Sequence, residues 1–155
     1  MTAEIVGAVL WGVLVAGLGA WLTELSPWYY ALKKPSWQPP DWLFGPAWTL
    51  ILGLAGYAFY LAWIMAADPS WAIGLFLVNG VVNMVWSLLF FRLRRPDLAL
   101  IEVPFLWLSI IAPMIALAAL SSTISWLLLP YLLWVSFASF LNLTIVRLNR
   151  PFTAR

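Results

Sequence analysis

The chain has 155 residues, of which 65% are hydrophobic and 9% are charged, with a formal net charge of +2. Soluble domains carry about 25% charged residues, so a chain of this length cannot hide its apolar side chains from water, and we expect lipid to surround it. The sequence has no cysteine and no histidine, which excludes disulfides, thiol chemistry and the common zinc sites.

Five apolar runs of about 20 residues or more follow one another, each long enough as a helix to cross the roughly 30 Å hydrocarbon layer of a bilayer. Backbone polar groups in lipid must be paired within their own segment. The sequence therefore predicts an all-α membrane protein, a single domain over residues 1–155 built as a bundle of five transmembrane helices. The expected helices cover 5–25, 42–67, 71–91, 98–120 and 126–146.

The first run, 5–25, starts near the N-terminus, but no basic segment precedes it and it lacks a good cleavage site. We therefore expect a retained helix and not a signal peptide. Small residues recur every four positions at Ala8, Gly12, Ala16 and Ala20. Such a stripe permits close helix contact in lipid, although the spacing leaves open whether the partner lies in the same chain or in a second copy.

The connection over residues 26–41 is the longest polar interruption, and it is rich in tryptophan and tyrosine. Its four prolines and two adjacent lysines are Pro27, Pro35, Pro39, Pro40, Lys33 and Lys34. Proline fixes φ and restricts the residue before it, so the connection has a defined shape. We interpret it as a stiff aromatic lid, which suggests ligand capture.

The third run carries two amides, Asn79 and Asn83, one helical turn apart. A polar amide in lipid faces the bundle interior or a cavity. Trp48, Trp86 and Trp134 lie too deep for interface anchors, and Trp48 and Trp86 match the depth of the amides beneath the aromatic connection. An apolar pocket with a few polar groups is the usual form of a small-molecule site. The alternative is interhelical hydrogen bonding and core packing, and periodicity alone does not decide between the two.

The fourth run carries Glu102, the only acidic residue within a span apart from Glu24 near the end of the first run, and two prolines, Pro104 and Pro113, that should kink the helix. Because Glu102 lies near a helix start, we expect it to reach the interface or to pair with Arg94 or Arg95, and not to relay protons. The sequence shows no nucleophile–base pair, metal cluster or glycine-rich phosphate loop. It therefore argues against a hydrolytic or phosphoryl-transfer enzyme.

All eight lysines and arginines fall in three segments that five spans place on one side of the membrane. Those segments are the first connection, the turn after the third run and the C-terminal tail. The positive-inside rule then puts the N-terminus outside and the C-terminus in the cytoplasm. The same distribution explains the net charge without a nucleic-acid partner, and apolar helices favour a bacterial inner membrane.

Three groups of residues form a combined pattern. Residues 28–40 contain Trp-Tyr and then Leu-Lys-Lys-Pro-Ser-Trp-Gln-Pro-Pro, and residues 46–49 read Pro-Ala-Trp-Thr. The third helix has Asn-x3-Asn-x2-Trp-x3-Phe-Phe from Asn79, and the fifth has Pro-Tyr-x2-Trp-x2-Phe-Ala-x2-Leu-Asn from Pro130. In this order the motifs resemble the TspO/MBR family, the tryptophan-rich sensory proteins related to the mitochondrial translocator protein, and the resemblance covers essentially the whole chain.

The resemblance implies a five-helix bundle, usually dimeric, that binds porphyrins and synthetic isoquinoline or benzodiazepine-type ligands beneath the first loop. Protoporphyrin or heme would then be a ligand, and no cofactor is implied. Matched by motif position, the wall of the pocket consists of Tyr29, Trp48, Asn83, Trp86, Trp134 and Ala138.

Three functions stay open at this stage: a porphyrin-binding sensor or transporter, a light-dependent porphyrin-degrading enzyme, and a membrane scaffold whose aromatic residues only pack. For the enzyme, the resemblance implicates Trp48 and Trp134 in the photochemistry. Mitochondrial members carry a cholesterol motif at the end of the fifth helix, but Leu143 stands where that motif has a tyrosine. This departure argues against sterol binding.

Overall fold

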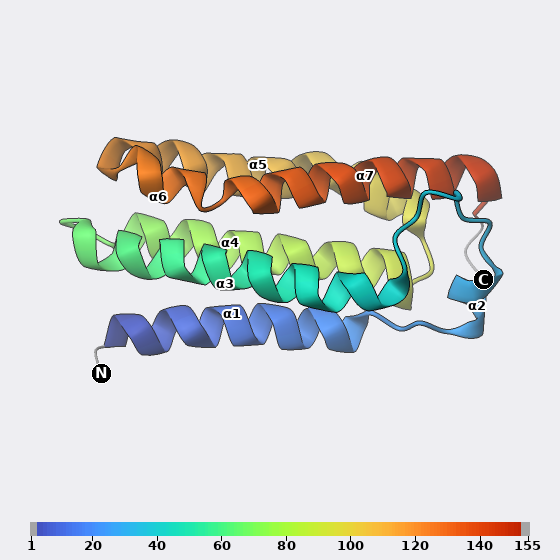
Figure 1. Ribbon diagram of the computed structural model, residues 1–155, viewed down its shortest axis with the longest axis horizontal. Coiled ribbons are helices and arrows are strands. Elements are labelled where there is room, and N and C mark those ends of the chain that lie inside the picture. The colour runs from blue at the N-terminus through green and yellow to red at the C-terminus, as the bar shows by residue number, and fades with distance from the viewer. Residues whose placement is uncertain (1–2, 153–155) are drawn as a thin grey trace.

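The computed structural model describes residues 3–152, and its long helices lie side by side along one axis (Figure 1). The five spans are α1 (Ala3–Leu22), α3 (Asp41–Met65), α4 with the π-helical turn η1 (Ser70–Ser87 and Leu88–Arg92), α5 (Pro96–Leu120), and α6 with α7 (Ser122–Trp126 and Leu129–Asn149). Each span is long and apolar enough to cross a bilayer, and residues 3–152 contain no strand. The prediction of an all-α bundle of five transmembrane helices is confirmed.

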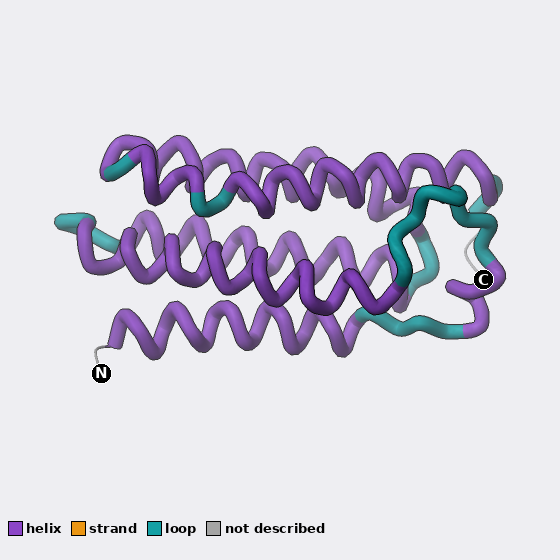
Figure 2. Tube along the Cα trace, in the orientation of Figure 1, coloured by secondary structure: helices purple, strands orange, loops and turns teal. Residues whose placement is uncertain are grey.

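Two local features differ from the expected pattern (Figure 2). The first connection contains a short helix, α2 (Pro27–Ala31), whose first position is a proline with φ already suited to a helix. The fifth span starts earlier than expected, as α6, and is interrupted at residues 127–128 before α7 continues. The basic tail residue Arg155 lies outside the described residues.

Part of the small-residue stripe on α1 joins α1 to α3. A Cβ atom placed on Gly12 would lie 3.8 Å from the carbonyl oxygen of Leu52, and one placed on Gly56 would lie 3.6 Å from the carbonyl oxygen of Ala8. The two backbones therefore approach closely where side chains are small. Ala8 is buried in this contact, whereas Ala16 is exposed. The first half of the stripe thus serves packing within the chain.

A glycine on α4 allows α1 to lie directly against that helix. The Trp11 Nε1–H donates a hydrogen bond to the Phe76 carbonyl oxygen at 2.7 Å, and the Trp11 ring packs edge-on against the Phe76 ring. A Cβ atom on Gly80 would lie 2.8 Å from Val15 Cγ2 and 3.1 Å from Trp11 Nε1. The indole reaches the backbone of α4 because position 80 has no side chain.

Replacing Gly80 by alanine is therefore expected to destabilise the bundle by about 1–3 kcal/mol, because Val15 and the Trp11 indole must both move. The matched control is Gly74 on the same helix, where a Cβ atom would meet no atom within 4 Å. Gly74→Ala should stabilise the protein by up to about 1 kcal/mol through helix propensity. Thermal unfolding in detergent measures both changes, and equal stability of the two variants would contradict this packing.

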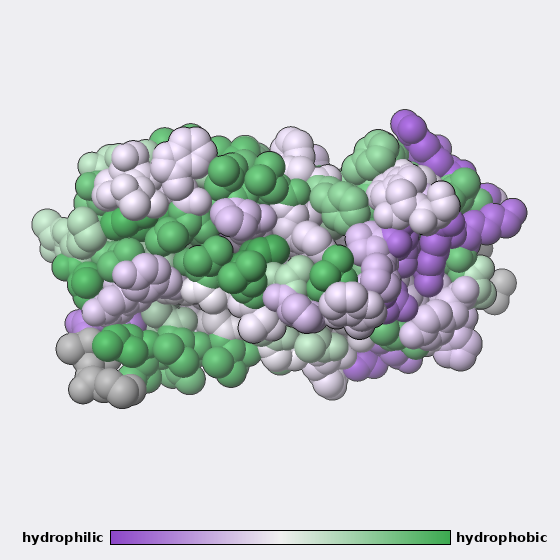
Figure 3. Space-filling view, viewed as in Figure 1, coloured by the Kyte–Doolittle hydropathy of each residue, from purple (hydrophilic) through white to green (hydrophobic). Residues whose placement is uncertain are grey.

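Hydrophilic residues gather at the end of the bundle that carries α2, and the face shown in Figure 3 is apolar along most of the remaining length. Here Arg92 pairs with Glu24 at 3.4 Å, and Arg95 pairs with Asp97 at 2.6 Å. The expected ion pair between Glu102 and Arg94 or Arg95 is wrong: neither Glu102 carboxyl oxygen has a hydrogen-bond partner within residues 3–152, and Arg95 binds Asp97, two residues along the chain. The aromatic connection and the basic residues thus share one end of the molecule.

Candidate functional site

The two amides of α4 point into the bundle and join it to other helices. Asn83 Nδ2 donates to the Tyr131 hydroxyl on α7 at 2.9 Å, and Asn79 Nδ2 donates to Ser109 Oγ on α5 at 3.0 Å. The Ser109 hydroxyl in turn donates to the Leu106 carbonyl oxygen at 2.7 Å. All three of these polar side chains on α4 and α5 are buried. Since buried polar groups require partners, these bonds fix the relative positions of α4, α5 and α7.

A small cavity of about 10 Å³ lies beside Asn83, between α3, α4, α5 and α7. Its walls are formed by Trp48, Asn83, Trp86, Leu106, Val135, Ala138 and Ser139. Four of the six residues expected from the motifs, Trp48, Asn83, Trp86 and Ala138, are therefore brought together from three helices. A space of this size holds about one water molecule, so the walls must separate before any ring system can enter.

The π-helical turn η1 places an aromatic pair next to this cavity. The Leu93 N–H bonds to the carbonyl oxygen of Leu88 at 2.9 Å, which closes a turn one residue wider than an α-helical turn. Phe90 is buried there and stacks on Trp86 with ring centroids 5.2 Å apart. The Phe91 and Trp86 rings form an edge-to-face pair with centroids 6.1 Å apart. The aromatic surface of Trp86 therefore continues toward the α2 end of the bundle.

Trp134 does not line the cavity, although its neighbour Val135 does. Its ring lies edge-on to the Phe44 ring, with centroids 5.6 Å apart, and is tilted against the Phe137 ring, with centroids 5.7 Å apart. Its Nε1–H is buried and has no hydrogen-bond partner within residues 3–152. Trp134 thus belongs to an aromatic layer between α3 and α7 and carries an unused hydrogen-bond donor.

Tyr29 lies at the α2 end of the bundle, in an apolar cluster that includes Phe90. Its hydroxyl donates to Asp41 Oδ1 at 2.9 Å and accepts a hydrogen bond from Gln38 Nε2 at 3.2 Å. Lys34 Nζ lies 3.6 Å from the centre of the Tyr29 ring, a cation–π contact. Burial and the bond to Asp41 raise the pKa of Tyr29 well above its usual range. The hydroxyl therefore stays protonated and holds the connection onto the start of α3.

The first connection is also bound to α7. The Trp37 ring stacks on Phe140 with centroids 5.3 Å apart and meets Phe137 edge-on at 5.9 Å. The Lys33 N–H donates to Asn149 Oδ1 at 2.8 Å, and Asn149 Nδ2 donates to the Lys33 carbonyl oxygen at 2.9 Å. Sequence reasoning missed Asn149, because its partner lies 116 residues away. The interpretation of the connection as a shaped aromatic cover is consistent with these contacts.

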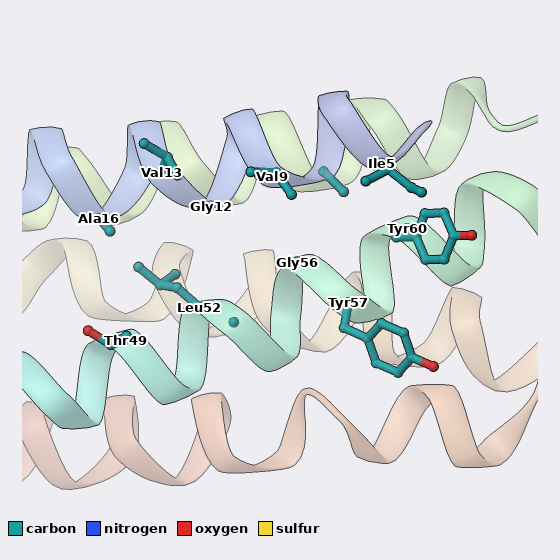
Figure 4. A pocket seen from close by; sticks show the side chains of 12 residues that line it. Ile5, Val9, Gly12, Val13, Ala16, Thr49, Leu52, Gly56, Tyr57 and Tyr60 are labelled. Atoms are coloured by element: carbon teal, nitrogen blue, oxygen red, sulfur yellow. The ribbon is translucent and has the colours of Figure 1, made fainter. Parts of the chain in front are cut away.

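A larger hollow of about 580 Å³ lies on the outer face between α1 and α3 (Figure 4). It is lined by Ile5, Ala8, Val9, Gly12, Val13, Ala16, Thr49, Leu52, Gly53, Gly56, Tyr57 and Tyr60. The Thr49 hydroxyl is already bonded to the Gly45 carbonyl oxygen at 3.0 Å. Binding sites for small molecules combine apolar walls with converging polar groups, and this groove lacks such convergence. It faces the region that lipid chains occupy in a bilayer.

The chain is similar to known proteins over most of its length. It matches the TspO/MBR family over residues 6–148. It is 43% identical over 130 residues to the tryptophan-rich protein TspO of Chlorobaculum tepidum. This match covers 80% of this chain and 81% of the relative. It is 37% identical over 149 residues to the tryptophan-rich protein TspO of Archaeoglobus fulgidus, a match that covers 94% of this chain and 97% of the relative. The human translocator protein is 32% identical to it over 126 residues, a match that covers 79% of this chain and 75% of the relative.

Proposed function

Because this chain belongs to the TspO/MBR family, we propose that it is a membrane receptor or transporter that binds protoporphyrin or a related tetrapyrrole. The observation that carries the proposal is the convergence of Trp48, Asn83, Trp86 and Ala138 on one interior cavity. Aromatic walls with a single amide suit a flat, largely apolar ring that needs few polar contacts.

Binding requires the cavity to open, because its present volume of about 10 Å³ admits no tetrapyrrole. We propose that α3 and α7 separate under the first connection. There the Trp134 ring contacts Phe44 and Phe137, and a flat ligand can replace such contacts with equivalent stacking. Once α3 and α7 have separated, the unpaired Trp134 Nε1–H would become available to an oxygen of the ligand.

The proposal also covers the placement of the protein. We infer a homodimer in a bacterial inner membrane, with the N-terminus outside and the C-terminus in the cytoplasm. The orientation is supported by the gathering of hydrophilic residues at the α2 end of the bundle (Figure 3) and by the positive-inside rule. A reporter fused after Arg155 should be active on the cytoplasmic side; activity restricted to the opposite side would contradict this orientation.

The direct test is a titration with protoporphyrin in detergent, followed through the porphyrin absorbance. We expect saturable binding, and Trp48→Phe should weaken it by roughly 2- to 13-fold, the equivalent of about 0.5–1.5 kcal/mol for a lost aromatic contact. Trp126→Phe is the control, because that ring is 62% exposed and belongs to α6, at the other end of the bundle. Absence of saturable binding by the unmodified protein would leave the scaffold function instead.

The same titration, continued under illumination, tests the enzyme alternative. With porphyrin in excess over protein, product analysis distinguishes turnover from simple binding. If the indole rings take part in a photochemical oxidation, Trp48→Phe should reduce degradation far more than it reduces binding. A parallel loss of both would favour a receptor or transporter.

A further inference from the structure

Positive charge is in excess at the end of the bundle that carries α2. All seven lysines and arginines within residues 3–152 lie there, against three acidic residues in the connecting segments and helix ends, Glu24, Asp41 and Asp97. Arg92 and Arg95 bind two of these carboxylates, and the third accepts a hydrogen bond from the Tyr29 hydroxyl. No other ion pair joins the described residues of this end, so several cations there are free to bind an anionic group from outside the chain.

Lys34 carries one of these unpaired charges, and two tyrosine rings hold it in place. Its Nζ atom lies 3.6 Å from the centre of the Tyr29 ring and 5.0 Å from that of the Tyr30 ring. Lys34 is half-buried, and desolvation lowers its pKa, outweighing the attraction of Asp41. The ammonium has thus lost part of its hydration without gaining an ion pair, and it carries three N–H donors.

The ring beneath Lys34 belongs to the same apolar cluster as part of the cavity wall. Tyr29 is buried in this cluster together with Phe90, and Trp86, which lines the cavity, packs against it. The Phe91 ring joins the two, since its centroid lies 5.7 Å from that of Tyr29 and 6.1 Å from that of Trp86. A continuous column of aromatic rings therefore leads from the interior cavity to the Lys34 ammonium.

Lys34 also belongs to the segment that covers the ligand in the proposed function. Three residues further along the chain, the Trp37 ring contacts Phe137 on α7, and Phe137 contacts Trp134. These are the rings beside which α3 and α7 would separate. A flat ligand that entered beneath this segment would have the edge nearest the polar end of the bundle directed toward the basic residues.

The chemistry of protoporphyrin fits this distribution of charge. Its ring is apolar, and its two propionate groups extend from one edge. An apolar cavity can accept the ring, but ionised carboxylates are costly to bury without a partner. The propionates should therefore point toward the α2 end. Among the unpaired cations there, only Lys34 is partly buried, because Lys33, Arg94, Arg147 and Arg150 are exposed.

We propose that the Lys34 ammonium forms an ion pair with a propionate of the bound tetrapyrrole, so that the site selects porphyrins with free carboxylates over their esters. The inference rests on the proposed function. Hydrogen bonds between two charged groups are stronger than neutral ones, and partial burial reduces the screening that weakens an exposed ion pair. Lys34 thus adds affinity and fixes which edge of the ring faces the first connection.

The experiment compares protoporphyrin IX with its dimethyl ester, which has the same ring and no ionisable carboxyl group. Binding of each porphyrin to the unmodified protein and to Lys34→Met is measured in a nonionic detergent. Lys34→Met should bind protoporphyrin IX roughly three- to tenfold more weakly, a range between an exposed ion pair and a charge-assisted hydrogen bond. Its affinity for the dimethyl ester should stay that of the unmodified protein. Each ratio compares one porphyrin on two proteins, so differences in detergent partitioning cancel.

The variants are matched to separate charge from packing. Methionine keeps an unbranched side chain that still packs on the Tyr29 ring. Lys34→Arg keeps the positive charge and should bind both porphyrins nearly as the unmodified protein does. Lys33→Met is the neighbouring control, because the Lys33 side chain is exposed and its bonds to Asn149 come from backbone atoms. This variant should change neither affinity.

An equal loss of affinity for both porphyrins in Lys34→Met would mean that Lys34 only positions the connection, and it would overturn the inference. Unchanged affinities would do the same and would leave a lipid headgroup as the partner of the ammonium. A loss in Lys33→Met or Lys34→Arg as large as that in Lys34→Met would also contradict a specific ion pair. Failure of the proposed function has a different signature, because the unmodified protein would then bind neither porphyrin in a saturable manner.

Discussion

Replacing Ala138 by phenylalanine is expected to abolish saturable porphyrin binding while the bundle still folds. Ala138 lines the cavity opposite residues of α3 and α4, and a phenyl group there would occupy the space that the ligand needs. Because the cavity measures only about 10 Å³, the larger side chain should also cost about 1–3 kcal/mol of stability through overpacking. Porphyrin titration and thermal unfolding of the same sample measure both effects.

The matched control is Leu133→Phe on the same helix. Leu133 is 60% exposed on the outer surface of α7, where a larger apolar side chain meets lipid and not the cavity. This variant should bind porphyrin with unchanged affinity and unfold at an unchanged temperature. Normal binding by Ala138→Phe would show that the ligand lies somewhere other than this cavity.

Replacing Trp37 by alanine is expected to speed the release of bound porphyrin without unfolding the helices. The change removes the ring contacts that hold the first connection against Phe137 and Phe140 on α7. Two aromatic contacts at about 0.5–1.5 kcal/mol each correspond to dissociation roughly 5- to 150-fold faster. Stopped-flow displacement of bound porphyrin measures the rate.

Trp42→Ala provides the comparison for this variant. Trp42 lies at the start of α3, near the same end of the bundle, but its side chain is 71% exposed. Its removal should leave the dissociation rate unchanged. Equal rates for Trp37→Ala and the unmodified protein would mean that the first connection does not cover the ligand.

The five spans could be predicted from the sequence because hydrophobic length alone specifies them in lipid. Their ends could not. The prediction extended the first helix to residue 25, whereas α1 ends at Leu22. Near this end, Arg92 Nη2 donates to the Trp21 carbonyl oxygen at 3.1 Å, and the Arg92 guanidinium lies 4.7 Å from the Trp21 ring centre. An arginine 71 residues away in the chain gives no local signal in the sequence.

The inward direction of the α4 amides followed from helical spacing, but the identity of their partners did not. Periodicity shows which face of a helix is polar, and it does not show that Asn83 meets Tyr131 from α7. Grouping Trp48, Asn83, Trp86 and Ala138 as one wall depended on the family resemblance. Of the two alternatives for Glu102, the ion pair with Arg94 or Arg95 is wrong: neither carboxyl oxygen has a partner within residues 3–152, and Asp97, two residues from Arg95, binds that arginine through two hydrogen bonds.

A structure of the protein determined with bound protoporphyrin tests the central claim most directly. We expect the ring to lie between α3, α4 and α7, against Trp48, Trp86 and Ala138, with the first connection above it. A ring bound instead in the outer groove between α1 and α3, over Gly12 and Gly53, with the interior cavity still closed, would contradict the proposed site.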